Sequence, residues 1–162
     1  MTHNVIILKE IKMKKILIAT AIALAATAAS ALEIGTTVTR GQSGATDRNG
    51  GGITLGHNYG ATTVTAGFER FTAGTNDQDR YSLVAGREVA RIKNASIAVK
   101  GGAAYLNNQT GQDGYAMTVG AGISIPLTKQ VALGLDVARQ YGQSRVQAFD
   151  GTRVTAGLNF RF

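Results

Sequence analysis

The sequence predicts an all-β fold, an eight-stranded antiparallel up-and-down transmembrane β-barrel, from three observations. Apolar residues recur at every second position along most of the chain from Leu32 onward, and no stretch shows a helical stripe. Glycine occurs 21 times and proline once, a composition that disfavours helices. Charged residues make up 17% of the chain, below the average of about 25% for soluble proteins. The shortage of polar surface indicates a protein surrounded by lipid.

The first element is an export signal. A basic start at Met13 is followed by an apolar run over 16–26 and by Ala29, Ser30 and Ala31, the small residues of a signal-peptidase site. The run is too short for a membrane-spanning helix, which needs about 20 residues. We therefore expect residues 1–31 to be a cleaved helical signal peptide, with 1–12 a wrongly assigned upstream start. The domain is then 32–162, and because several lysines leave with the signal, the net charge of +7 does not indicate a nucleic-acid partner.

Four alternating runs follow in the first half of the domain. Leu32, Ile34 and Val38 share one face of the first run, and Glu33 and Thr37 share the other. The next three repeat this arrangement of large apolar residues opposite small or polar ones. The predicted strands are 32–39, 53–59, 63–69 and 81–89.

The second half shows the same alternation more clearly. Val119, Ile123, Leu133 and Leu135 lie on the apolar faces of its middle two runs. Runs of roughly 9–11 residues match tilted strands that cross a bilayer. The predicted strands are 95–105, 115–125, 131–140 and 153–162.

Long and short connections alternate between these strands, as in a membrane barrel with long loops at one end and tight turns at the other. The predicted long loops are 41–51, 73–80, 107–114 and 142–151, and the short turns lie near 60–61, 90–94 and 126–130.

The two faces of the strands decide which side meets lipid. The second face carries mainly Gly, Ala, Ser and Thr, which are too small to build an aliphatic core. We therefore expect the apolar face to point outward and the small face to line a narrow lumen, and a secreted soluble β-sandwich is the disfavoured alternative. The aromatic residues fit girdles at both interfaces: Tyr59, Phe160 and Phe162 at the turn end, and Tyr81, Tyr105, Tyr115 and Tyr141 at the loop end.

Charged residues on the small face must pair inside so narrow a tube. We expect Lys100 and Asp136 near mid-height, and Glu33 and Arg161 in contact across the seam between the first and last strands. The full predicted lumen network is Glu33, Glu69, Glu88, Lys100, Asp136, Arg153 and Arg161.

The C-terminal run 154–162 ends in phenylalanine, like the assembly signal of bacterial outer-membrane proteins. With the signal peptide and the Pro126-Leu127-Thr128 turn, residues 32–162 resemble the small outer-membrane β-barrel family, which includes OmpA-like transmembrane domains, OmpX-like proteins and opacity-type surface proteins of the porin family. The residues of the assembly signal are Val154, Ala156, Leu158, Phe160 and Phe162.

The resemblance implies a monomer in the bacterial outer membrane with both termini periplasmic, inserted by the barrel assembly machinery. It implies a structural or surface-interaction role through four extracellular loops. A small diffusion channel is the alternative, and a lipid A-modifying enzyme is a weaker one.

Few residues point to ligand chemistry. Arg40, Arg70 and Arg139 lie outward at the loop end and are candidate contacts for lipopolysaccharide phosphates, although arginines also reach toward water at such positions without a ligand. His57, expected on the lipid face, has no neighbouring His-x-Ser pattern, so no catalytic residue is predicted.

Residues 50–52 are three glycines without the Lys-Ser/Thr of a phosphate loop, and we expect them at a flexible loop end. The sequence has no cysteine and no metal-ligand spacing, so we expect no cofactor and no metal.

Overall fold

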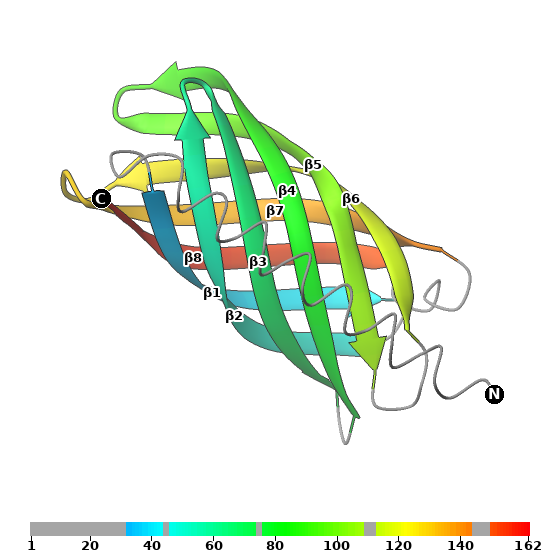
Figure 1. Ribbon diagram of the computed structural model, residues 1–162. Coiled ribbons are helices and arrows are strands. Elements are labelled where there is room, and N and C mark those ends of the chain that lie inside the picture. The colour runs from blue at the N-terminus through cyan, green and yellow to red at the C-terminus, as the bar shows by residue number, and fades with distance from the viewer. Residues whose placement is uncertain (1–31, 44–45, 74–75, 109–112, 144–149) are drawn as a thin grey trace.

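Eight strands form one closed sheet in the computed structural model, which describes residues 32–43, 46–73, 76–108, 113–143 and 150–162 (Figure 1). Each strand pairs antiparallel with the next, and β1 also pairs with β8, so the sheet has no free edge. The predicted up-and-down barrel is confirmed, and a two-sheet sandwich is excluded. The strands are β1 (Leu32–Ser43), β2 (Thr46–Tyr59), β3 (Thr62–Ala73), β4 (Asn76–Ile92), β5 (Ala95–Asn108), β6 (Gly114–Pro126), β7 (Val131–Gly142) and β8 (Gly151–Arg161).

The predicted signal peptide lies outside the described residues, so its cleavage stays a prediction. Within the described part of the chain, no helix is long and apolar enough to cross a membrane.

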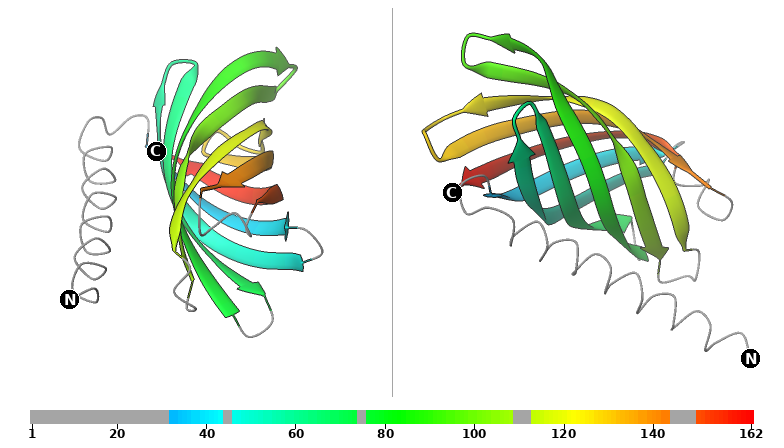
Figure 2. Two further views of the ribbon diagram at one scale, coloured as in Figure 1. Left: turned by 90° about the vertical axis from the view of Figure 1, so that its right-hand side faces the viewer. Right: turned by 45° about the horizontal axis from the view of Figure 1, so that its top comes forward.

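Tight turns close one end of the barrel. β2 and β3 are joined by Gly60 and Ala61, and Gly60 has a φ of 63°, which a residue without a Cβ adopts at no steric cost. In the turn after β6, the Thr128 hydroxyl accepts the Val131 N–H at 3.0 Å. The Phe162 N–H donates to the Leu32 carbonyl at 3.0 Å, so both ends of the described barrel meet on this side, which we call the turn end (Figures 1 and 2).

The opposite end, the loop end, differs from expectation at two of its four connections. Residues 41–51 and 73–80 were predicted as long loops, but β1 and β2 pair as far as Ser43 and Thr46, and β3 and β4 as far as Ala73 and Asn76. The prediction of four long loops is therefore wrong for the first two connections. The glycine and polar residues of these segments are typical of loops. In the barrel, however, the backbones of neighbouring strands supply hydrogen-bond partners, so the strands continue beyond the part that carries apolar side chains.

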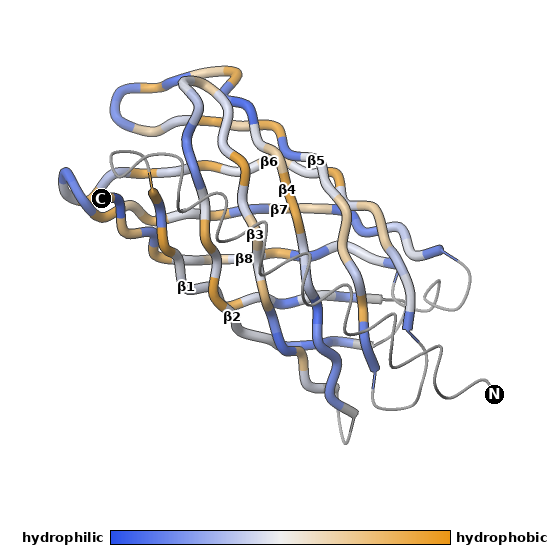
Figure 3. The backbone as a smooth tube through the Cα atoms, in the orientation of Figure 1, coloured by the Kyte–Doolittle hydropathy of each residue, from blue (hydrophilic) through white to orange (hydrophobic). Residues whose placement is uncertain are grey.

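The outer surface of the barrel is apolar. Leu135, Val119 and Ile123 are 44%, 58% and 42% exposed, respectively, rather than packed together in a dry interior. The hydrophilic residues gather toward the strand ends (Figure 3). The buried apolar residues of the described chain form only a small cluster of Leu106 and Ala116. The large apolar side chains therefore face outward on the barrel, as in proteins that contact hydrocarbon.

Aromatic residues form a row across four neighbouring strands near the loop end. Phe68 on β3 pairs in register with Tyr81 on β4, which pairs with Tyr105 on β5, and Tyr105 pairs with Tyr115 on β6. The ring centroids of Tyr105 and Tyr115 are 5.4 Å apart, and those of Phe68 and Tyr81 are 5.2 Å apart. Such a row marks the level of a membrane–water interface.

This exterior predicts a depth-dependent cost for a charge. Leu135→Arg should lower the free energy of unfolding by about 2–4 kcal/mol, because Leu135 lies at mid-strand on the outer face. Val89→Arg, at the exposed bulge near the turn end of β4, should cost about 1 kcal/mol or less. Urea unfolding in lipid vesicles measures both, and equal costs would contradict a bilayer around the barrel.

Candidate functional site

The inner face of the barrel is lined by small and polar side chains and encloses the candidate site. A cavity of about 370 Å³ occupies the lumen from the turn end to Glu69 and Arg80. Most of its wall is Gly, Ala, Ser and Thr, as predicted from the second face of the strands. The charged side chains of the lumen divide into three groups along the tube.

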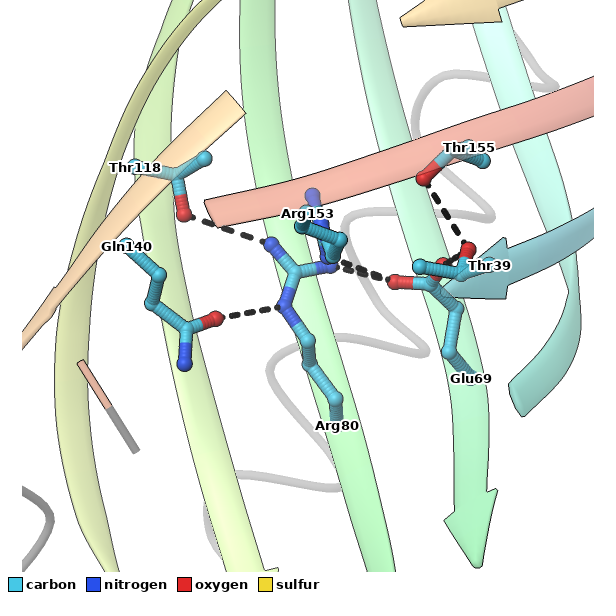
Figure 4. Close-up of polar contacts among 7 residues, drawn as sticks. All are labelled: Thr39, Glu69, Arg80, Thr118, Gln140, Arg153 and Thr155. Atoms are coloured by element: carbon cyan, nitrogen blue, oxygen red, sulfur yellow. Dashed lines mark hydrogen bonds and ion pairs between the residues drawn. The ribbon is translucent and has the colours of Figure 1, made fainter. Parts of the chain in front are cut away.

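The first group is a hydrogen-bonded cluster around Arg80 in the loop-end half of the tube (Figure 4). Arg80 Nη1 lies 2.6 Å from Glu69 Oε2, and Arg153 Nη1 lies 2.9 Å from the same oxygen. The other carboxylate oxygen of Glu69 accepts the Thr39 hydroxyl at 2.7 Å. We call this the Arg80 cluster, and its members are Thr39, Glu69, Arg80, Thr118, Gln140, Arg153 and Thr155.

Burial of Arg80 makes this cluster a plug. Arg80 is 2% exposed, and its remaining donors reach Gln140 Oε1 and Thr118 Oγ1, each at 3.3 Å. Arg80 and Arg153 line both the large cavity and a smaller one of about 40 Å³ on the loop side. The cluster therefore fills the tube between the two cavities.

Arg80 is the important lumen residue that the sequence interpretation missed. The sequence predicts a strand that begins at Tyr81, and this leaves Arg80 in the predicted loop 73–80. The inward positions of β4 in fact continue from Ser82 to Arg80 and Gln78, all three buried. The alternation of faces continues from Tyr81 toward the N-terminus of the strand. Extending it by one residue would have placed Arg80 in the lumen.

The second group is a single ion pair near mid-height, between Lys100 on β5 and Asp136 on β7. Lys100 Nζ contacts Asp136 Oδ1, and the two side chains are about one-third exposed to the cavity. Gly122 on β6 lies between their strands, and a Cβ at this position would collide with the Asp136 carboxylate. The missing side chain of Gly122 thus gives the pair its space.

The third group lies at the turn end. Arg161 Nε donates to Glu33 Oε2 at 3.3 Å across the β1–β8 seam, and Asn58 Nδ2 reaches the same oxygen at 3.3 Å. Glu88, also predicted for this end, accepts two hydrogen bonds from Arg91 at 3.1 and 2.8 Å. The register shifts between Glu88 and Ala90, so β4 carries a bulge beside this pair.

The three outward arginines at the loop end differ in their partners. Arg40 Nη2 lies 2.5 Å from Asp47, and Arg70 donates two hydrogen bonds to Asp79, at 2.7 and 3.1 Å. The hydrogen bond and negative charge of Asp79 raise the pKa of Arg70. Arg139 lies 5.8 Å above the centroid of the Tyr141 ring. The positive charge of Arg40 and Arg70 is therefore already compensated within the barrel.

His57 is not part of a catalytic arrangement in the described residues. It lies in the outward register opposite Leu32 and Val64, with its ring 4.4 Å from that of Tyr59. Its Nδ1 atom is buried without a hydrogen-bond partner in the described chain, so no Ser-His-acid chain runs through it. The described residues also contain no group of three acidic, His or Cys side chains that could hold a metal ion.

The three glycines 50–52 are not at a loop end, which corrects the prediction. They lie within β2 and pair with both β1 and β3. A Cβ on Gly50 would meet the Phe71 ring at 2.6 Å, and one on Gly52 would meet Glu69 at 2.8 Å. Glycine is needed at positions 50 and 52 because the backbone of β3, together with the Glu69 and Phe71 side chains, lies close against β2.

The C-terminal residues of the predicted assembly signal lie on β8 and just beyond it. Four of them alternate on the outer face and Phe162 is 63% exposed at the turn end. Their outward row is Val154, Ala156, Leu158 and Phe160.

Comparison with solved structures finds this architecture in small outer-membrane barrels. The N-terminal β-barrel domain of Pseudomonas aeruginosa OprF aligns with a TM-score of 0.64 at 16% identity, over 82% of this chain and 98% of that one. Neisserial surface protein A gives 0.63 at 14% identity, over 81% and 96%. Ail, the attachment invasion locus protein of Yersinia pestis, gives 0.53 at 16% identity, over 82% and 96%. No family model matches the chain, and no characterised protein matches it in sequence. The chain therefore has the fold of the small eight-stranded outer-membrane barrels.

The lumen groups predict unequal costs for removing a cation. Arg80→Ala should lower the free energy of unfolding by about 3–5 kcal/mol, because it strips a buried carboxylate of one of its two guanidinium partners. Lys100→Ala should cost roughly 1 kcal/mol, because water in the cavity screens its pair. Urea unfolding in vesicles measures both, and a cost for Lys100→Ala equal to that for Arg80→Ala would contradict this ranking.

Proposed function

We propose that this protein is a bacterial outer-membrane barrel whose lumen is closed. The barrel holds its loop end at the membrane surface, where that end has a structural or surface-interaction role. The observation that carries the proposal is the Arg80 cluster. It fills the lumen of a barrel whose exterior is apolar, so the wall suits a bilayer and the interior does not suit transport.

The orientation follows from the two ends of the barrel. Residues 32 and 162 lie with the tight turns, and we place this end in the periplasm, where short turns lie in barrels of this type. The loop end then faces outward. The names of two similar structures, a surface protein and an attachment invasion locus protein, favour the same kind of role.

A small diffusion channel is the alternative. It has the large cavity in its favour, because this space is polar and wide enough for several waters. Against it stands the plug: ions entering from the turn end meet the buried Glu69 and Arg80 before they reach the loop end. A lipid A-modifying enzyme is less supported, because His57 Nδ1 is buried without a hydrogen-bond partner among the described residues and is therefore not oriented by an acid.

Lipid and assembly partners complete the proposal. We propose that the barrel is a monomer, that Arg40, Arg70 and Arg139 lie among the lipopolysaccharide headgroups, and that Arg139 contributes most. Arg139 lies over an aromatic ring, whereas the other two are paired with carboxylates. We also propose that the outward row of β8 and Phe162 is read by the barrel assembly machinery.

Conductance tests the closed tube. In planar bilayers the wild-type barrel should show no steady single-channel current, and a variant with Glu69, Arg80 and Arg153 all changed to Ala should conduct. Heat-modifiable gel mobility would first establish that the variant folds. Wild-type current equal to that of the folded variant would favour the channel instead.

Export has a separate test. The protein recovered from the outer-membrane fraction should begin at Leu32, because cleavage after Ala31 removes 1–31. Ala29→Arg with Ala31→Arg should abolish cleavage, whereas changing Met1 should leave the amount of mature protein unaltered. N-terminal sequencing and fractionation measure these outcomes, and an uncleaved wild-type protein would overturn the signal assignment.

A further inference from the structure

The wall of the barrel has a step at its turn end, between β3 and β4. Pairing between these strands stops at Arg87, apart from a hydrogen bond from the Glu88 N–H to the Ala61 carbonyl at 2.8 Å. β4 continues to Ile92 in a hairpin with β5, and this hairpin projects beyond the β2–β3 turn (Figures 1 and 2). In the described part of the chain, the end of β4 therefore has no strand on its β3 side. We call residues 87–93 the step.

Two exposed cations of the step have no ion pair with any described residue. Arg87 lies on the outer face of β4, in register with the outward Val99 of β5. Lys93 lies in the turn that follows, and its φ is 52°. Glycine or asparagine adopts this left-handed conformation with less strain, so the backbone of the turn gives no reason for a lysine there. The step thus presents two positive charges to its surroundings.

The described carboxylates of the turn end are either bound by other residues or far from the step. Two of them point into the lumen and are bound there by arginines, in the pairs Glu88–Arg91 and Glu33–Arg161. The third is the C-terminal carboxylate, which follows β8, and β8 lies opposite β4 in the closed sheet. The partner of the two step cations must therefore come from outside the described chain.

Apolar side chains accompany the cations. Val89 and Ile92 are 57% and 62% exposed, and both lie nearer the turn end than Arg87. Backbone groups without a partner are not stable in hydrocarbon, so the open side of β4 belongs at the level of the lipid headgroups. The two apolar side chains suit acyl chains instead. Cations, open backbone groups and apolar side chains together match the layer where lipid phosphates meet the upper acyl chains.

We infer that the step binds the headgroup of an anionic phospholipid from the periplasmic leaflet, with Arg87 as the main contact. A guanidinium offers a fork of donors that matches a phosphate, and basic residues beside a membrane surface attract anionic lipids. A soluble phosphate would leave Val89 and Ile92 unused, whereas a lipid covers them with its acyl chains. The inference rests on the proposed orientation of the barrel in the outer membrane. The site is separate from the loop-end arginines proposed to contact lipopolysaccharide.

Native mass spectrometry with added lipid tests the inference. The protein is recovered from the outer-membrane fraction, transferred to detergent micelles and titrated separately with phosphatidylglycerol and phosphatidylcholine. The first phosphatidylglycerol should bind about tenfold more tightly than the first phosphatidylcholine, because only the former carries a net negative charge. Arg87→Gln should weaken phosphatidylglycerol binding about fivefold and Lys93→Gln about twofold, because the first loses a phosphate contact and the second only a nearby charge.

Two control variants remove a cation elsewhere and should bind phosphatidylglycerol as the wild type does. Lys129→Gln removes an exposed lysine from the β6–β7 turn at the same end, and Arg139→Gln removes an arginine at the loop end. Heat-modifiable mobility verifies that each variant is folded. Equal binding of the two lipids by the folded wild type, or equal loss in Arg87→Gln and a control, would overturn the inference. Displacement of the lipid by inorganic phosphate would also overturn it. Each of these results leaves the proposed function standing, whereas absence of the protein from the outer-membrane fraction would overturn both.

Discussion

The structure depends on pairing between its first and last strands. In a bilayer no water is present to bond a free strand edge, so a sheet can span it only when the sheet closes on itself. β1 and β8 pair from Glu33–Arg161 to Gln42–Thr152, which leaves no open edge on either strand. The same contact brings Glu33 and Arg161 together, although 128 positions separate them in the chain. The backbone pairing that closes the barrel thus also forms the Glu33–Arg161 ion pair at the turn end.

When the sheet closes with its apolar face outward, the charged residues of the other face point into the lumen. Their charges must then be balanced by oppositely charged or polar side chains inside the barrel. This balance is uneven along the length of the tube. At the turn end and mid-height, each carboxylate of the pairs described above meets one cation, and the cavity around them leaves room for water. In the loop-end half, Glu69 is shared by two arginines and the space is filled. The result is a barrel that is hollow toward one side and closed toward the other, which supports the proposed role as an anchor.

Small residues on the inner face are what allow the large polar ones to fit. A side chain at Gly122 would occupy the position of the Asp136 carboxylate, and a side chain at Gly67 would meet the Ser82 hydroxyl at 2.8 Å. At these positions glycine is a packing requirement of the lumen rather than a sign of a flexible loop. The same reason applies to Gly50 and Gly52, which are part of a strand.

The sequence by itself determined the strand count, the alternation of faces, the apolar exterior and the turn end, because a period of two residues and tight-turn chemistry are local properties. It also placed Lys100 near Asp136, since face and height along a strand can be read from the chain. Only the tertiary structure decided where strands end at the loop side, because pairing with a neighbour sustains a strand whose own composition favours a loop. For the same reason only closure revealed Arg80 as the centre of the plug. Its partners Thr118 and Gln140 lie on β6 and β7, which do not neighbour β4 in the sheet, and no local pattern brings those strands together.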